Sequence, residues 1–263
     1  MNGPVIRNPW AQLRRFTAAR IALGRSGVSL PTEAQLAFQL AHAQARDAVH
    51  FELDAAVLAQ NLTAALGLPC VRLHSAAPDR ATYLRRPDLG RKLDPASRMS
   101  LTRGAYDIGF VIADGLSALA IEQHALPFLR CWLGALAPES CVVAPLVIVK
   151  QGRVAVGDEV AQLLGMHLVV VMIGERPGLS SPDSMGLYLT WRPHVGMTDE
   201  RRNCISNVRP AGLNYEGAAR KLHYLIAKAR RRGISGIALK DDSDAAPALD
   251  VQANFLLSSG SDT

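Results

Sequence analysis

The sequence predicts an α/β protein with a mostly parallel sheet, helices on both faces of that sheet, and a helical N-terminal region. Two observations support this fold class. Between residues 70 and 240, short apolar runs typical of buried strands alternate with longer amphipathic patterns typical of helices. Before residue 70 the apolar spacing is helical throughout. A strand, helix, strand order favours parallel strands, because the crossover helix carries the chain back to the edge of the sheet at which the first strand began.

The strand that defines the predicted sheet lies at residues 168–172, LVVVM. Its five apolar residues are too few to span a membrane and suit a strand buried on both faces. Similar runs occupy residues 107–113 and 144–149. Ligands in open α/β sheets bind beyond the carboxyl ends of the strands, so we expect the loops that follow these runs to line one crevice. All three loops carry glycine: Asp114-Gly115-Leu116-Ser117, Lys150-Gln151-Gly152-Arg153-Val154 and Gly174-Glu175-Arg176-Pro177-Gly178.

Three helical patterns make up the N-terminal region. The first covers residues 9–25 and is amphipathic. The second begins at Thr32, the expected N-cap, and has a buried stripe that includes Phe38. The third covers residues 54–66 and is closed by a glycine.

The remaining elements follow the same alternation. Strands are expected at residues 70–74, 186–191 and 234–240, and helices at residues 117–136, 157–164 and 215–232. The sequence therefore divides into a helical N-terminal region at residues 1–69, a Rossmann-like α/β domain at residues 70–240, and an acidic tail at residues 241–263. The tail has five aspartates and no lysine or arginine, and we expect it to be disordered.

The formal charge of +6 is unevenly distributed. Removing the five aspartates of the tail leaves +11 for residues 1–240. A body this basic could bind nucleic acid or an acidic protein surface, or its arginines could simply form a solvated face. The basic loop at residues 80–91 presents a similar choice, between a solvated loop and an interface or ligand clamp. An aromatic content of 5% and the lack of an RNP-like strand count against base stacking.

Several kinds of site are disfavoured. The four cysteines are dispersed without a C-x-x-C pair, which argues against a disulfide framework and a zinc knuckle. Histidines on predicted helices lack H-x-x-x-H spacing, so no metal site is expected. No Walker A loop and no G-x-G-x-x-G follows any strand. No apolar run approaches the ~20 residues of a membrane span and the start lacks a secretory signal, so we expect a cytoplasmic protein.

Three positions carry candidate chemistry, each with a structural alternative. Ser117 begins a helix whose free N–H groups could hold an anion or amide oxygen, although an N-cap needs no ligand. Glu175 ends the central strand beside Arg176, and the two could instead form a weak surface pair. Cys204 could be a nucleophile, but no histidine lies near it in sequence, and free cysteine is commonly a small buried hydrophobe.

Six motifs occur in order along the chain: FTAARIALGR at residues 16–25, YLRRPDLGR at 83–91, DGLS at 114–117, GRV at 152–154, GERPGL at 174–179 and CISN at 204–207. Together they make the sequence resemble the small-subunit family of adenosylcobalamin-dependent ethanolamine ammonia-lyase. The resemblance covers about residues 10–240. Several ordered motifs are more specific than any single one.

The resemblance implies a subunit of a radical enzyme that converts ethanolamine to acetaldehyde and ammonia. It implies adenosylcobalamin as cofactor and a larger TIM-barrel subunit as partner, with no nucleic acid or membrane partner. The family's cobalamin contacts match Val154, Glu175 and Cys204, and no catalytic residue is implied in this subunit. Base-on cofactor binding is expected, because residues 114–119 lack the histidine of an Asp-x-His-x-x-Gly loop. The alternatives are a basic α/β module for a nucleotide or RNA and a free-standing enzyme that uses Cys204.

Overall fold

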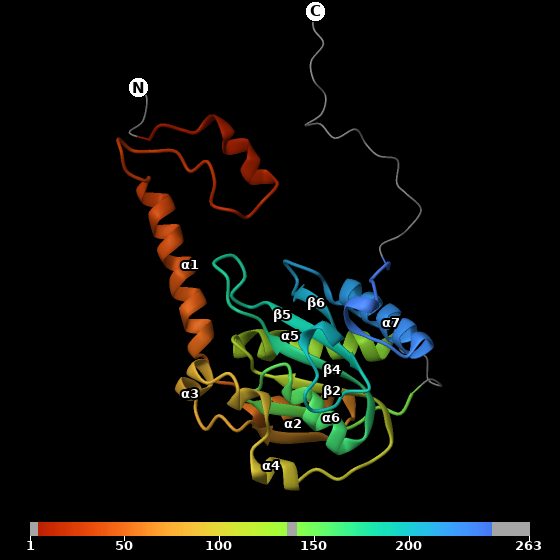
Figure 1. The fold of residues 1–263 in the computed structure, drawn as a ribbon. Coiled ribbons are helices and arrows are strands. Elements are labelled where there is room, and N and C mark those ends of the chain that lie inside the picture. Colours follow the sequence, from red (N-terminus) through yellow and green to blue (C-terminus); the bar gives the residue numbers. More distant parts are fainter. Residues whose placement is uncertain (1–4, 136–140, 244–263) are drawn as a thin grey trace, which may run out of the picture.

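The computed structural model describes residues 5–135 and 141–243, which fold around one six-stranded sheet (Figure 1). Neighbours among the first four strands of the sheet are parallel, whereas β5 pairs antiparallel with both β4 and β6. The α/β class is therefore confirmed, but the sheet is mixed because its last two strands alternate in direction. In sheet order the strands are β1 (Cys70–His74), β3 (Leu146–Lys150), β2 (Tyr106–Ala113), β4 (Met166–Gly174), β5 (Met185–Trp191) and β6 (Arg202–Val208).

Branched aliphatic residues place β2, β3 and β4 in the middle of the sheet. Every residue of β4 except His167 is buried, and most residues of β2 and β3 are buried as well. Side chains from these strands fill both faces, as expected for central parallel strands. The strands predicted at residues 70–74, 107–113, 144–149, 168–172 and 186–191 are all confirmed, to within two residues at their ends.

Helices cover both faces of the sheet, as predicted. One face packs against α2 (Ala55–Leu66), α5 (Ala118–Gly134) and α7 (Tyr215–Arg232), and the other packs against α6 (Val156–Leu164). Local capping explains where these helices begin and end. The side chains of Asp54 and Ser117 accept backbone N–H bonds at the starts of α2 and α5, and Gly67 ends α2 with a left-handed φ of +69°. The end of the predicted helix at residue 136 lies outside the described residues.

The N-terminal region differs from its prediction. Instead of one helix over residues 9–25, a short 3-10 helix, η1 (Pro9–Arg15), is followed by irregular chain that bridges back to Ile6 at Arg25. Then α1 (Thr32–His50) begins with Pro31 at the N-cap, so Thr32 is the first helical residue and does not cap. Figure 1 shows this segment and α1 projecting from the sheet. Phe38 is accordingly 41% exposed, contrary to the predicted buried stripe, because only part of α1 meets the body.

The strand predicted at residues 234–240 is wrong. That segment contains a single 3-10 turn, η4 (Gly236–Ala238), and the edge of the sheet is β6 instead. The side chain of Asn203 in β6 donates to the backbone oxygens of Gly236 (3.1 Å) and Leu239 (2.7 Å). These side-chain bonds hold the segment beside β6 without a strand ladder.

The basic loop at residues 80–91 folds into two short helices, α3 (Arg80–Arg85) and η2 (Leu89–Arg91), followed by α4 (Pro95–Met99). Tyr83 is fully buried, and the guanidinium carbons of Arg80 and Arg153 lie 4.9 and 4.2 Å from its ring centroid. This half of the loop is therefore part of the body. Arg85 and Arg86 are exposed, and Arg86 forms an ion pair with Asp88 at 2.7 Å.

Candidate functional site

The three loops at the carboxyl ends of β2, β3 and β4 meet, as the sequence predicts, but they bond to one another where the sequence predicts a crevice. The backbone N–H of Leu116 donates to the oxygen of Gly174 at 2.9 Å. The carboxylate of Asp114 accepts from the backbone N–H groups of Gln151 (2.9 Å) and Gly152 (3.1 Å). These bonds pack the loops against one another, so their centre is filled by protein.

The carboxylate of Asp114 has a structural role, since it bonds backbone groups of the loops around it. Its side chain is buried and accepts a third backbone bond, from Gly115, which has a left-handed φ of +60°. Burial raises the pKa of Asp114, although the backbone N–H groups and the nearby Arg80 favour the charged form. Ser117 accepts from the N–H of Ala120 and donates to a backbone oxygen of the β4–β5 loop. Ser117 is thus an N-cap whose hydrogen bonds are made within the protein, which is the alternative to an anion site.

Glu175 lies in a different setting, half-buried at the end of β4. Its Oε1 accepts from Ser206 Oγ at 2.6 Å, and its Oε2 accepts from Ser184 Oγ and from the backbone N–H of Asn207 at 3.2 Å. A carboxylate offers about four lone-pair positions. One acceptor position on Oε1 therefore remains for a further donor.

Glu175, Val154, Tyr188 and Cys204 share the face of the sheet that packs against α6. Val154 and Tyr188 both pack against the apolar cluster on that face. Cys204 lies directly opposite Tyr188 in the β5–β6 pairing, and Glu175 continues the alternation of Val171 and Ile173, two members of the cluster. Cys204 itself is exposed. All three residues singled out by the sequence therefore line one side of the sheet.

The electrostatics of Cys204 disfavour a nucleophile. Although Cys204 is exposed overall, desolvation of the thiol raises its pKa, a hydrogen bond with Tyr188 lowers it, and the charge of Glu175 raises it again. The pKa of Tyr188 is also raised, chiefly by burial. Because a raised pKa keeps the thiol protonated at neutral pH, the side chain of Cys204 is uncharged.

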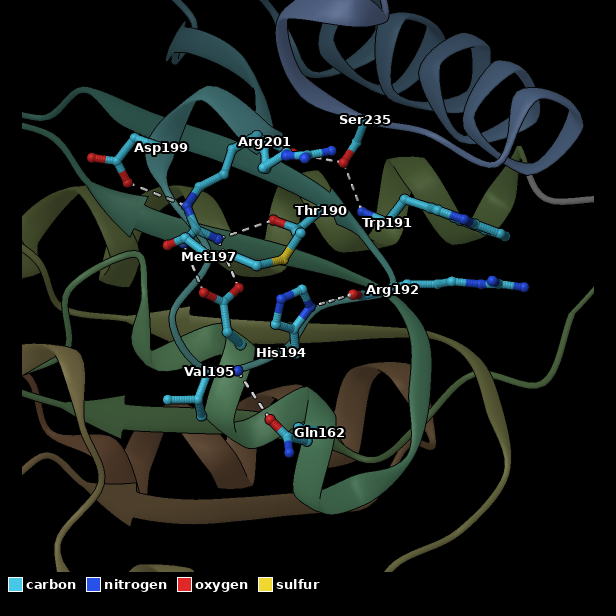
Figure 2. A network of polar contacts seen from close by, with 12 residues as sticks. Gln162, Thr190, Trp191, Arg192, His194, Val195, Met197, Asp199, Arg201 and Ser235 are labelled. Carbon is cyan, nitrogen blue, oxygen red and sulfur yellow. Dashed lines mark hydrogen bonds and ion pairs between the residues drawn. The ribbon is translucent and has the colours of Figure 1, made fainter.

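A buried ion pair fixes α6 against β6 beside this face. Arg202 of β6 donates to both carboxylate oxygens of Asp158 of α6, each at 2.7 Å, and to Thr190 Oγ1 at 3.2 Å. Arg202 also contacts Asp199 and the backbone oxygen of Met197. Figure 2 shows Thr190 on β5, and Met197 and Asp199 on the loop after β5, around this guanidinium. Burial raises the pKa of Asp158, while the bond to Arg202 opposes that change. The pair holds α6 over the central strands and leaves Cys204 uncovered.

A cleft of about 710 Å³ borders Val154 through its neighbour Ala155. Its lining residues include both charges: Arg91, Lys92 and Arg98 are basic, and Asp158, Glu159 and Asp199 are acidic. Val154, Glu175 and Cys204 do not line it.

Sequence reasoning missed the residues that orient Glu175 and Cys204. Tyr188 lies between Leu187 and Leu189 on β5, so its side chain is on the opposite face of the sheet from these buried leucines and faces the site. The alternating run GLYLTW already predicts this placement. Ser184 gave no such signal, because its role depends on the antiparallel return of β5. Across residues 5–135 and 141–243, no three His, Cys, Asp or Glu side chains gather as a metal site, and no helix is long and apolar enough to cross a membrane.

Comparison with known proteins relates this geometry to one family. The family model of the ethanolamine ammonia-lyase light chain matches residues 7–240. The chain is 56% identical to the ethanolamine ammonia-lyase small subunit of Azotobacter vinelandii, with 98% of each chain covered. It is 55% identical to proteins of the same name from Pseudomonas fluorescens, with 95% of each chain covered, and Ralstonia nicotianae, with 96% of each covered.

Proposed function

This chain belongs to the ethanolamine ammonia-lyase light-chain family, and we propose that it serves as the small subunit of a lyase that converts ethanolamine to acetaldehyde and ammonia. The observation that carries this proposal is the family match, which covers the α/β body and most of the N-terminal region. The relatives match over nearly their whole lengths. None of these names supports the alternative of a nucleotide- or RNA-binding module.

The proposed cofactor is adenosylcobalamin, bound base-on and contacted by Val154, Glu175 and Cys204. A corrin ring is a broad apolar plate edged with amides, so it suits a surface with an aliphatic contact, a carboxylate acceptor and an uncharged thiol. The three residues fit this requirement, since they lie on one face of the sheet and Glu175 keeps a free acceptor position. When bound, the cofactor supplies a carbon radical by homolysis of its cobalt–carbon bond.

The roles of this chain's own residues are binding, orientation and exclusion of water. Glu175 would accept an N–H from an amide at the corrin edge. Val154 would pack against the ring, and Cys204 would fill the space beside it without taking part in a covalent step. Exclusion of water protects the radical from side reactions.

The proposed partner is the large subunit, a TIM barrel that holds ethanolamine on the other side of the cobalamin. The exposure of Cys204 in the isolated chain supports this, because tight retention of a two-faced cofactor requires that both faces be buried. Residues 5–50 would dock on the partner, whereas α2 packs on the sheet and would belong with residues 70–240 to the Rossmann-like cofactor domain. The tail predicted to be disordered at residues 241–263 lies outside the described residues beyond Ser243. Trp10 and Phe16 are 68% and 73% exposed and would be covered in the complex. The complex would work in the cytoplasm or inside a bacterial microcompartment.

An assay for acetaldehyde from ethanolamine tests the proposal. The purified chain is mixed with adenosylcobalamin, with and without the large subunit, and the large subunit alone serves as control. We expect turnover only when both subunits are present. Turnover by the isolated chain, or no gain when this chain is added to its partner, would overturn the proposal.

A further inference from the structure

Arg209 lies just after β6, where the two segments that hold Glu175 approach each other. Its side chain is only 14% exposed. Nε donates to Asn207 Oδ1 (2.9 Å), Nη1 to Asp183 Oδ1 (3.2 Å) and Nη2 to the oxygen of Ser180 (3.2 Å). Ser180 and Asp183 belong to the β4–β5 loop, whereas Asn207 is near the end of β6. The guanidinium thus ties these two segments together.

Asn207 connects this tie to Glu175. Its backbone N–H donates to Glu175 Oε2, and its φ is +60°, in the left-handed region. A residue other than glycine keeps such a conformation when the surrounding structure holds it. Arg209 holds the side chain of Asn207, and the N–H of Leu213 holds its backbone oxygen at 2.8 Å. Arg209 therefore helps set the direction of the N–H that reaches Glu175.

Asp183, which accepts from Arg209, also contacts the helices that cover the sheet. Asp183 Oδ2 lies 3.2 Å from His124 Nε2, and His124 Nδ1 lies 2.9 Å from the hydroxyl of Tyr215. His124 is buried on α5, and Tyr215 begins α7. A continuous set of polar contacts runs from two packed helices through Asp183 and Arg209 to Asn207. Groups held by rigid elements keep their geometry better than groups on free loops.

We infer that Arg209 is a positioning residue, which holds the Glu175 carboxylate in the orientation that accepts a corrin amide. This inference rests on the proposed cobalamin contact of Glu175. Lysine cannot replace arginine here, because an ammonium is a compact point charge and lacks the planar fork that reaches three separate acceptors.

The test begins with Arg209→Lys in the complex with the large subunit, using cyanocobalamin as an unreactive binding probe. We expect affinity to fall about tenfold, the effect of weakening one buried hydrogen-bonded contact. With adenosylcobalamin, the KM for cofactor should rise while kcat at saturating cofactor stays within about twofold of the parent. Arg232→Lys, at the exposed end of α7, is the matched control and should leave affinity unchanged. Parent affinity in Arg209→Lys would overturn the inference.

A double-mutant cycle tests whether Arg209 acts through Glu175. If it does, Arg209→Lys should cost less than about twofold once Glu175→Ala is present, because the group it positions has gone. A full, additive loss would mean a general structural role and would overturn the inference. Unchanged affinity in Glu175→Ala alone would instead refute the proposed cobalamin contact, so the two failures are distinguishable.

Asn207→Gly provides a second route if Arg209→Lys does not assemble. Glycine adopts the φ of +60° freely and keeps the N–H toward Glu175, but it removes the amide that Arg209 holds. We expect cyanocobalamin affinity about threefold below the parent, a partial loss of one hydrogen-bonded contact. Parent affinity in this variant would also overturn the inference.

Discussion

Two carboxylates at neighbouring strand ends have opposite surroundings. Asp114, after β2, is 2% exposed and accepts three backbone N–H groups. Glu175, after β4, is half-buried and accepts from two hydroxyls and one backbone N–H. Both positions obey the rule that polar loops follow parallel strands, and both carboxylates accept three hydrogen bonds, but only Glu175 is exposed enough for a further donor to reach it. The two acids differ in location. Asp114 lies where the loops after β2 and β3 pack on each other, whereas Glu175 lies beside β5 and β6, where its carboxylate is partly exposed.

The largest effect should follow from removing the internal carboxylate. Asp114→Ala should lower the free energy of unfolding by about 3 kcal/mol or more, because three buried N–H groups lose their acceptor at about 1 to 3 kcal/mol each. Urea denaturation followed by circular dichroism measures this. Glu175→Ala is the matched variant and should cost about 1 kcal/mol, since its donors can turn to water. Equal losses would contradict the contrast between the two acids.

Glu175→Ala, the milder of these two variants for stability, should be the one that weakens cofactor binding. Glu175→Ala should weaken cobalamin binding in the assembled complex by about 1 to 3 kcal/mol, the cost of leaving a buried amide donor without its acceptor. Equilibrium dialysis with cyanocobalamin measures the change, and Glu122→Ala on the exposed side of α5 is the control. Unchanged affinity would remove Glu175 from the site.

The pH dependence of Cys204 gives a smaller effect. Because its pKa is raised above that of an ordinary thiol, the thiolate fraction at pH 7.5 should be low and should grow only at a more alkaline pH than for an ordinary thiol. Alkylation by iodoacetamide, followed by mass spectrometry of the Cys204 peptide at several pH values, should show this late rise. Cys204→Ser identifies the peptide. Rapid labelling at pH 6 would indicate a lowered pKa and revive the nucleophile hypothesis.

The smallest effect on folding should come from the exposed basic pair. Arg85→Glu with Arg86→Glu should leave the stability of the chain almost unchanged but slow assembly with the large subunit, more so at low salt. Stopped-flow mixing at two salt concentrations measures the rate, and Arg232→Glu is the charge-matched control for one of the two reversals. Equal rates for parent and variant would show that this surface does not guide docking.

The sequence predicted the parallel strands well because their aliphatic runs are a local signal. It missed β6 because the residues of that strand do not alternate simply between apolar and polar. The inward position of Arg202 carries a charge, and its partner Asp158 lies far away in sequence. Residues 234–240 look more strand-like, yet no strand forms there, and three backbone groups of the segment, at Gly236 and Leu239, bond to the side chain of Asn203.

The candidate site was predictable only in part, for the same reason. Strand ends and motifs point to Val154, Glu175 and Cys204, and the structure brings all three to one face. The contacts that orient them, from Ser184, Tyr188 and Asn207, depend on the antiparallel return of β5 and β6. Apart from the alternation in GLYLTW that places Tyr188, long-range pairing of this kind leaves no periodic signal in the sequence. The helix predicted over residues 9–25 is an error of the opposite kind, because a local pattern is present without the structure that it predicts. The apolar residues of that amphipathic pattern are largely exposed and do not pack on the sheet.

The buried pair between Asp158 and Arg202 also sets an order of events during synthesis. The chain emerges from the ribosome with α6 complete before β6 exists. Docking of α6 at that stage would bury Asp158 without its cation, at a cost on the order of 3 to 5 kcal/mol. The nascent parallel strands therefore stay incompletely covered until Arg202 has been added, and a fragment that ends before β6 should remain open to chaperones and proteases.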